Sequence, residues 1–181
     1  MVMAEAHGCT DFRQAALACL DGLYGYAMSL SHNQADAEDL VQDTYVKAVR
    51  AMDQLAPDSN VKSWLYAILR NAWLNQIRHL QSGPQFVGMD DEHHEDTIGR
   101  ACSNDDPYNS YVARAERESI RAALEQLPVL YREVIVLREF EGLSYQEIAE
   151  IVHCPAGTVM SRLDRARKRL RTLLSEWSQR P

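Results

Sequence analysis

Several features that mark common protein classes are missing from this chain of 181 residues. Its uninterrupted apolar runs contain only a few residues each, whereas a membrane-spanning helix needs about 20. The first twenty residues carry Glu5, Asp11 and Arg13, a pattern unlike that of a signal peptide. We therefore expect a cytoplasmic protein without a membrane-inserted segment.

Cysteine is also scarce, and the four cysteines lie far apart with no C-x-x-C pair: Cys9, Cys19, Cys102 and Cys154. Such spacing predicts neither a disulfide framework nor a zinc site, and we expect buried, inert thiols. His93, His94 and Cys102 suggest a metal sensor, but their spacing in an acidic stretch favours chance. The sequence contains no phosphate loop, nucleophile motif or metal-ligand cluster, so we expect no cofactor and no catalytic activity.

Basic residues are outnumbered in the chain as a whole but not in its last part. Lys and Arg number 19 against 26 Asp and Glu, and the formal net charge of −7 by itself argues against a nucleic-acid partner. Residues 81–110 contain one basic and seven acidic side chains, whereas residues 157–181 contain seven basic and two acidic ones. A basic C-terminal segment, suited to nucleic acid, thus follows a strongly acidic middle.

The apolar periodicity predicts an all-α protein, because no alternating strand pattern and no internal repeat occur. Three amphipathic helices are expected before residue 82. Asn33 is the expected cap of the second helix, whose apolar face includes Leu40 and Val49. The opposite face of that helix carries polar side chains, among them Asp39, Gln42 and Asp43.

The third helix is expected from about Val61 to Leu80, after the break Pro57-Asp58-Ser59-Asn60. Trp64 lies on its apolar side, where core packing is favoured over base stacking. A separate face carries polar side chains: Ser63, Arg70, Asn71 and Arg78. This helix therefore has one face for a core and another for a partner.

The helical pattern disappears from Gln81 to Ser110, where the acidic cluster at residues 90–96 predicts a flexible linker. We therefore expect two small helical domains joined by this linker. The expected boundaries are 1–82 for the first domain, 83–107 for the linker and 108–181 for the second domain.

A helix-turn-helix is predicted between Ser144 and Leu174. Ser144 and Glu147 have the spacing of a capping box, His153-Cys154 forms the turn, and Pro155 occupies the first position of a longer helix. The outer face of the longer helix carries hydroxyl and then basic side chains: Thr158, Ser161, Arg162, Arg165, Lys168 and Arg169. That order suits a helix in the DNA major groove, where Arg donates to guanine; the alternative is a solvated basic helix.

Two sets of motifs resemble bacterial sigma factors of the extracytoplasmic-function (ECF) type, in the sigma-70 family. Similar to region 4 are Leu143-Ser144-Tyr145-Gln146-Glu147-Ile148-Ala149, Gly157-Thr158-Val159 and Ser161-Arg162-Leu163. Similar to region 2 are Ala37-Glu38-Asp39-Leu40-Val41-Gln42-Asp43, Trp64-Leu65-Tyr66 and Arg70-Asn71. The matches cover most of residues 10–80 and 110–175.

The resemblance implies a sigma factor with regions 2 and 4 only, which binds core RNA polymerase and directs promoter-specific initiation. Docking on a coiled coil of the largest catalytic polymerase subunit is implied for Asp39, Gln42 and Asp43. Contacts with −10 DNA are implied for Asp58, Ser59, Asn60, Ser63, Arg70, Asn71 and Arg78. Contacts with −35 DNA are implied for Ser144, Tyr145, Thr158, Ser161, Arg162, Arg165, Lys168 and Arg169. An anti-sigma factor is implied as a further partner, and the linker is implied to thread the polymerase cleft.

The sequence departs from the family pattern at Met160, where a basic residue is common, and at Asn75, where an acidic one is common. Asp164 either repels phosphate or accepts a hydrogen bond from cytosine, and both interpretations stay open. Two other functions fit parts of the chain: a sigma-like mimic that sequesters an anti-sigma factor, and a stand-alone helix-turn-helix regulator. The intact basic face weighs against the mimic, and the polar face with Asp39 would be idle in the regulator.

Overall fold

The structure is a computed structural model that describes residues 12–56, 59–82 and 117–178. Every regular element in these ranges is helical, which confirms the predicted all-α class. The elements are α2 (Leu20–Ser31), α3 (Gln34–Ala51), the short 3₁₀ turn η1 (Met52–Gln54), α4 (Val61–Ser82), α6 (Val129–Ile135), the π-helical turn η2 (Val136–Phe140), α7 (Tyr145–Val152) and α8 (Ala156–Ser178). Residues 12–18 and 117–125 are also helical, and the predicted linker lies outside the described residues.

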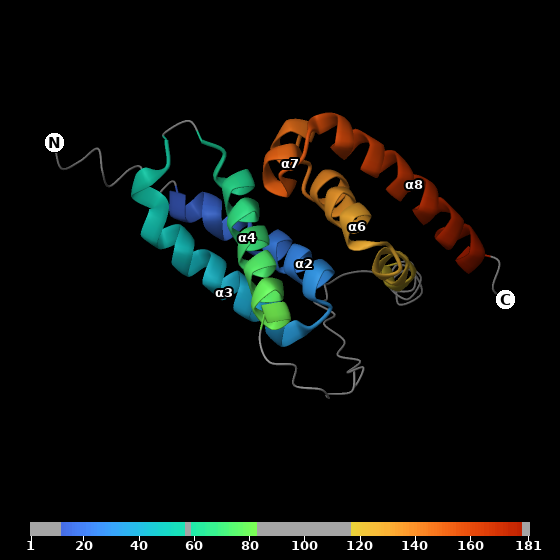
Figure 1. The fold of residues 1–181 in the computed structure, drawn as a ribbon, viewed down its shortest axis with the longest axis horizontal. Coiled ribbons are helices and arrows are strands. Elements are labelled where there is room, and N and C mark those ends of the chain that lie inside the picture. Colours follow the sequence, from blue (N-terminus) through green and yellow to red (C-terminus); the bar gives the residue numbers. More distant parts are fainter. Residues whose placement is uncertain (1–11, 57–58, 83–116, 179–181) are drawn as a thin grey trace, which may run out of the picture.

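The N-terminal half is a bundle in which α3 packs against both α2 and α4 (Figure 1). Asn33 caps α3 as predicted, because its side chain accepts a hydrogen bond of 3.1 Å from the backbone N–H of Asp36. Val49 was expected on the apolar face but is 61% exposed, whereas the neighbouring Ala48 is buried. One helical position is a rotation of about 100°, which carries Val49 beyond the strip that α2 and α4 cover.

The C-terminal half contains the predicted helix-turn-helix, formed by α7 and α8. Both hydrogen bonds of the capping box are present: the Glu147 amide donates to Ser144 Oγ at 3.2 Å, and the Ser144 amide donates to Glu147 Oε2 at 2.7 Å. His153 ends α7 in the left-handed conformation, with φ of 51°. The next helix begins at Ala156, one residue after the expected Pro155, whose carbonyl accepts from the first turn of α8.

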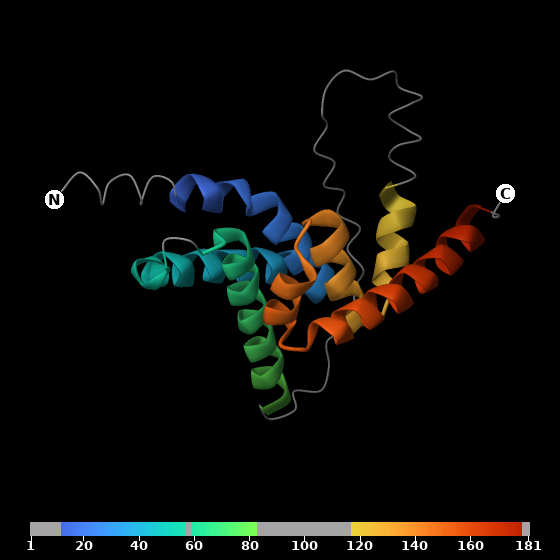
Figure 2. The ribbon, with the colours of Figure 1, turned by 90° about the horizontal axis from the view of Figure 1, so that it is seen from above.

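The two halves pack on each other through α7 beside α4 and α6 beside α2 (Figures 1 and 2). Their buried apolar side chains form a single cluster, which includes Leu69 of α4 and Ile151 of α7. The modules that the sequence predicts as separate domains therefore share a core in this structure.

The described helices include none with the length and apolarity to cross a membrane. Cys19 and Cys154 are free thiols, half-buried rather than buried as expected, and burial raises the pKa of Cys19. No group of three or more potential metal ligands occurs among the described residues. His93, His94, Cys9 and Cys102 lie outside the described part of the chain.

Candidate nucleic-acid and polymerase interfaces

The outer side of α8 is a basic surface, called the α8 basic face and defined by Thr158, Ser161, Arg162, Arg165, Lys168 and Arg169. Val159, Leu163 and Ala166 are buried on the opposite side, so their periodicity fixes the orientation of the helix. Thr158 and Arg162 are half-buried, and the other four side chains of the face are exposed. The structure therefore brings together all the α8 residues predicted to contact −35 DNA.

The charges on α8 differ in their availability. Lys168 Nζ lies 2.8 Å from Asp164 Oδ2, and this hydrogen bond lowers the pKa of Asp164. Arg167 is tied to Glu139 of η2, with 2.6 Å between Nη2 and Oε1. Arg165 and Arg169 are exposed and have no ion-pair partner among the described residues. Within the α8 basic face, these two guanidinium groups are thus the freest to meet phosphate or guanine.

Ser144 and Tyr145 lie at the start of α7, where Ser144 is exposed and its oxygen already accepts the capping hydrogen bond. The Arg138 guanidinium lies over the Tyr145 ring, 4.8 Å from Cζ to the ring centroid. Arg138 also donates to the Leu143 carbonyl at 2.7 Å. Sequence reasoning missed Arg138, because its contacts with Tyr145 and Leu143 depend on the fold of the turn between η2 and α7.

A polar row along α3 presents Asp39, Gln42 and Asp43, all exposed as predicted. Asp43 pairs with Lys47 one turn later, at 2.6 Å. Val46 continues the same row, because positions three and four apart share a helix face. Its side chain is 47% exposed. The α3 surface is therefore mainly anionic, with one apolar side chain that the sequence prediction did not include.

The N-terminus of α4 is capped by Asn60, whose Oδ1 accepts from the backbone amides of Lys62 and Ser63 at 3.0 and 3.3 Å. Ser59 and Ser63 are half-buried beside this cap, and Asp58 lies outside the described residues. Arg78, near the other end of the helix, is exposed and donates to Asn75 at 3.1 Å. The residues predicted to contact −10 DNA are therefore spread along α4, not gathered at one end.

Arg70 is placed differently from the sequence expectation. It was expected on an open polar face of its helix, but it is buried, with its Nε 2.7 Å from Glu133 Oε1. The cause is that α7 of the C-terminal half covers this side of α4 and that Glu133 of α6 reaches Arg70. Asn71 remains exposed, although its Oδ1 lies 3.3 Å from the His153 ring.

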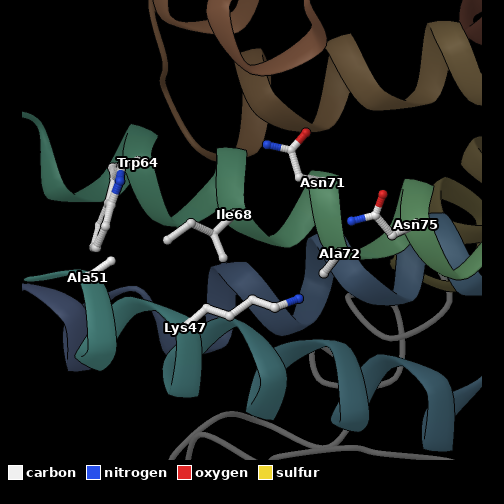
Figure 3. Close-up of a pocket in the computed structure, with 7 residues that line it drawn as sticks. All are labelled: Lys47, Ala51, Trp64, Ile68, Asn71, Ala72 and Asn75. Atoms are coloured by element: carbon white, nitrogen blue, oxygen red, sulfur yellow. The ribbon is translucent and has the colours of Figure 1, made fainter.

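A cavity of about 290 Å³ lies between α3 and α4 (Figure 3). Its lining consists of Lys47, Ala51, Trp64, Ile68, Asn71, Ala72 and Asn75. An aromatic ring, two amides and an ammonium group around one cavity suit a single nucleobase, which stacks on one group and hydrogen-bonds with others. Trp64 is only half-buried, so its core role is partial.

Lys47 and Asn75 were not among the predicted site residues. They come from different helices, and only the packing of α3 against α4 places them in one cavity. The sequence signal for Asn75 was its position four residues after Asn71, on the same face of α4.

Comparisons with known proteins find one family for both halves of the chain. The family model "Sigma-70 region 2" matches residues 16–82, and "Sigma-70, region 4" matches residues 117–170. The ECF RNA polymerase sigma factor EcfG of Rhodopseudomonas palustris is 36% identical over 164 residues, 91% of this chain and 85% of that relative. The ECF RNA polymerase sigma-E factor of Escherichia coli K12 is 36% identical over 135 residues, 74% of this chain and 71% of that relative.

Two solved structures have the same arrangement of helices. The sigma factor RpoE from Bartonella quintana, in complex with the anti-sigma factor NepR, is 35% identical with a TM-score of 0.70, covering 91% of this chain and 97% of that one. CnrH, in complex with the cytosolic domain of CnrY, is 28% identical with a TM-score of 0.60, covering 91% and 88%. The chain therefore belongs to the sigma-70 family, as an RNA polymerase sigma factor of the ECF type.

Proposed function

We propose that this chain binds core RNA polymerase and directs it to promoters, reading the −35 element with α8 and opening the −10 element with α4. The α8 basic face carries the proposal, because Arg165 and Arg169 project from it without ion-pair partners among the described residues. Counterion release by such cations supplies the salt-dependent part of DNA affinity, even in a chain with a net charge of −7.

The −35 element is read in the major groove by the N-terminal turns of α8. Thr158 and Ser161 contact base edges or phosphates there, and Arg162, Arg165, Lys168 and Arg169 supply positive charge further along the helix. Ser144 and Tyr145 contact the DNA backbone from the N-terminus of α7, where the helix dipole favours an anion.

The −10 element is opened on α4. The α3–α4 cavity receives one base taken out of the stack, with Asn71, Asn75 and Lys47 on its polar side. Polar side chains before and along α4 bind the rest of the strand: Asp58, Ser59, Asn60, Ser63, Arg70 and Arg78. The contact from Arg70 requires that the C-terminal half first move off α4, because Arg70 is buried in the described arrangement.

Polymerase is bound by the polar row of α3, where Asp39, Gln42 and Asp43 face a basic coiled coil of the largest catalytic subunit. The acidic segment 83–107 threads the polymerase cleft between a first domain at 1–82 and a second at 108–181. The chain has no catalytic activity of its own and acts in the cytoplasm, where polymerase and DNA meet. An anti-sigma factor holds it in reserve; the related RpoE of Bartonella quintana forms a complex with the anti-sigma factor NepR.

Transcription from a randomised promoter library, with purified chain and its own core polymerase, tests this proposal. We expect transcripts that share two sequence elements upstream of their start points and that depend on the chain. A chain that fails to bind core and enriches no promoter would refute it. A mimic of a sigma factor would also enrich no promoter, and a stand-alone regulator would bind duplex DNA but not core.

A further inference from the structure

The C-terminal half directs three carboxylates at α4 and at the residue that caps it. The pairs are Arg70 with Glu133, Lys62 with Glu141, and Asn60 with Glu147. Glu133 Oε1 lies 2.7 Å from Arg70 Nε, and Glu141 Oε2 lies 3.0 Å from Lys62 Nζ. Lys62 also donates to the Glu141 carbonyl at 2.7 Å. Anionic acceptors thus engage side chains from the cap at Asn60 to Arg70 in the helix proposed to hold the −10 strand.

The turn of the helix-turn-helix reaches the proposed base cavity. His153, the residue that ends α7, has its Nε2 3.3 Å from Asn71 Oδ1. Asn71 lines the cavity and extends from the side of α4 that faces the C-terminal half (Figure 3). The C-terminal half therefore engages the cavity rim as well as the cationic side chains of α4.

We propose that the C-terminal domain is an internal competitor for the −10 strand, so that closed domains and strand binding exclude each other on α4. This inference rests on the proposed −10 function of α4. Carboxylate and phosphate oxygens are both anionic acceptors for Lys, Arg and amide N–H groups, so Glu133, Glu141 and Glu147 take the partners that strand phosphates require. The −10 strand binds α4 only when the two domains separate.

The contact between the halves affects α4 but leaves the other two proposed binding surfaces exposed. The exposed side chains of the α8 basic face and the polar row of α3 point away from the contact between the halves. A closed chain therefore presents its surfaces for polymerase and for duplex DNA, while Asn60, Lys62 and Arg70 stay engaged by carboxylates of the C-terminal half. Docking on polymerase through α3 precedes engagement of the −10 strand.

The polar character of the contact fits an interface that opens. Glu133 Oε2 and Arg132 Nε are buried and have no hydrogen-bond partner among the described residues. Buried unsatisfied groups are uncommon in permanent cores, and a buried ion pair adds little net stability. The interface between the halves thus lacks the full polar pairing of a permanent core.

Energy transfer between fluorophores at positions 50 and 172, both exposed, measures closure in the full chain. Glu141→Lys places two ammonium groups together and is expected to lower the closed-to-open ratio about fivefold or more. The double variant Lys62→Glu with Glu141→Lys restores the pair in reverse and is expected to close again. Glu150→Lys, the same charge change at an exposed site of α7, is the matched control and should leave closure unchanged.

Fluorescein-labelled 20-nucleotide single-stranded DNA and its duplex test the competition with the same variants. Glu141→Lys should gain more affinity for the single strand than Glu150→Lys does, whereas the two variants should gain equal affinity for the duplex. A saturating concentration of the single strand should open the wild type. Unchanged closure in Glu141→Lys, or strand binding that leaves the wild type closed, would overturn the inference. If the single strand binds no variant, the −10 proposal for α4 fails, and the competition fails with it even where the charge swap restores closure.

Discussion

The Arg70 guanidinium of α4 and the Glu133 carboxylate of α6 form a buried ion pair, with 2.7 Å between Nε and Oε1. The Tyr26 hydroxyl donates to the same Glu133 oxygen at 3.3 Å. Burial and the neighbouring Glu133 carboxylate raise the pKa of Tyr26 well above its ordinary value, so its hydroxyl remains a donor. One carboxylate thus receives hydrogen bonds from two helices of the other half, 63 and 107 residues away in sequence.

Removing this carboxylate leaves a buried guanidinium without its counter-charge. Glu133→Ala is expected to lower the free energy of unfolding by about 3–5 kcal/mol, measured by urea denaturation. The double variant Arg70→Met with Glu133→Leu should recover most of that loss, because apolar side chains of similar size replace the pair. Arg121→Ala, which breaks an exposed pair, is the control and should cost about 0.5 kcal/mol or less. A loss in Glu133→Ala no larger than in the control would show that the buried pair is not formed.

Gly22 of α2 allows Glu141 and Tyr66 to approach the helix closely. A Cβ at this position would lie 2.5 Å from the Tyr66 hydroxyl and 2.6 Å from Glu141 Oε2, whereas a Cβ at Gly25 would meet nothing within 4 Å. Gly25→Ala should raise helix stability by about 0.5–1 kcal/mol. Gly22→Ala should instead cost about 1–3 kcal/mol by displacing Glu141 from Lys62. Thermal unfolding measures both, and equal effects of the two substitutions would contradict the packing.

Local features were predictable from the sequence because their partners lie within a few residues. The capping box of Ser144 and Glu147 and the cap at Asn33 are of this kind, and both were confirmed. The burial of Arg70 was not predictable, because its partner, Glu133, follows the acidic segment in the sequence and belongs to the other half of the structure. The α3–α4 cavity depends in the same way on packing between helices, which left Lys47 out of the predicted site.

The α8 basic face should contribute both affinity and sequence preference. Ser161→Ala with Arg165→Ala is expected to abolish promoter-specific binding of the holoenzyme, measured by competition against random duplex. Loss of the Arg165 charge alone should lower the slope of log affinity against log salt by about 1, because one phosphate contact is lost. Arg121→Ala removes an exposed cation outside α8 and should leave both readouts unchanged. A wild-type promoter preference in the double variant would assign DNA reading to another surface.

His32 gives the closed arrangement a pH dependence. Its ring contacts the Arg132 guanidinium, which also donates to the Ser29 carbonyl at 2.7 Å. Burial and Arg132 lower the pKa of His32 below its ordinary 6.5, although Glu125 acts in the opposite direction. The neutral ring is favoured in the closed form, so closure should be fullest above pH 6.5 and weaken as the pH falls below it.

Energy transfer between positions 50 and 172 measures this pH dependence. His32→Asn, which suits the left-handed backbone at this position, should flatten the profile, whereas the exposed His79→Asn should not. A profile that is unchanged in His32→Asn would assign the titration to other groups.

Run-off transcription tests the central claim most directly: that this chain joins core polymerase through α3 and starts transcription at a promoter. With the promoter selected from the random library, we expect one start point with core plus wild-type chain and none with core alone. Asp39→Lys with Asp43→Lys should lose both core binding and the transcript, because it turns an anionic row cationic towards a basic partner. Asp21→Lys with Glu118→Lys, the same charge change at exposed sites elsewhere, should retain both. A transcript from the α3 variant equal to that of the wild type would contradict the polymerase interface, and no transcript from the wild type would contradict the function itself.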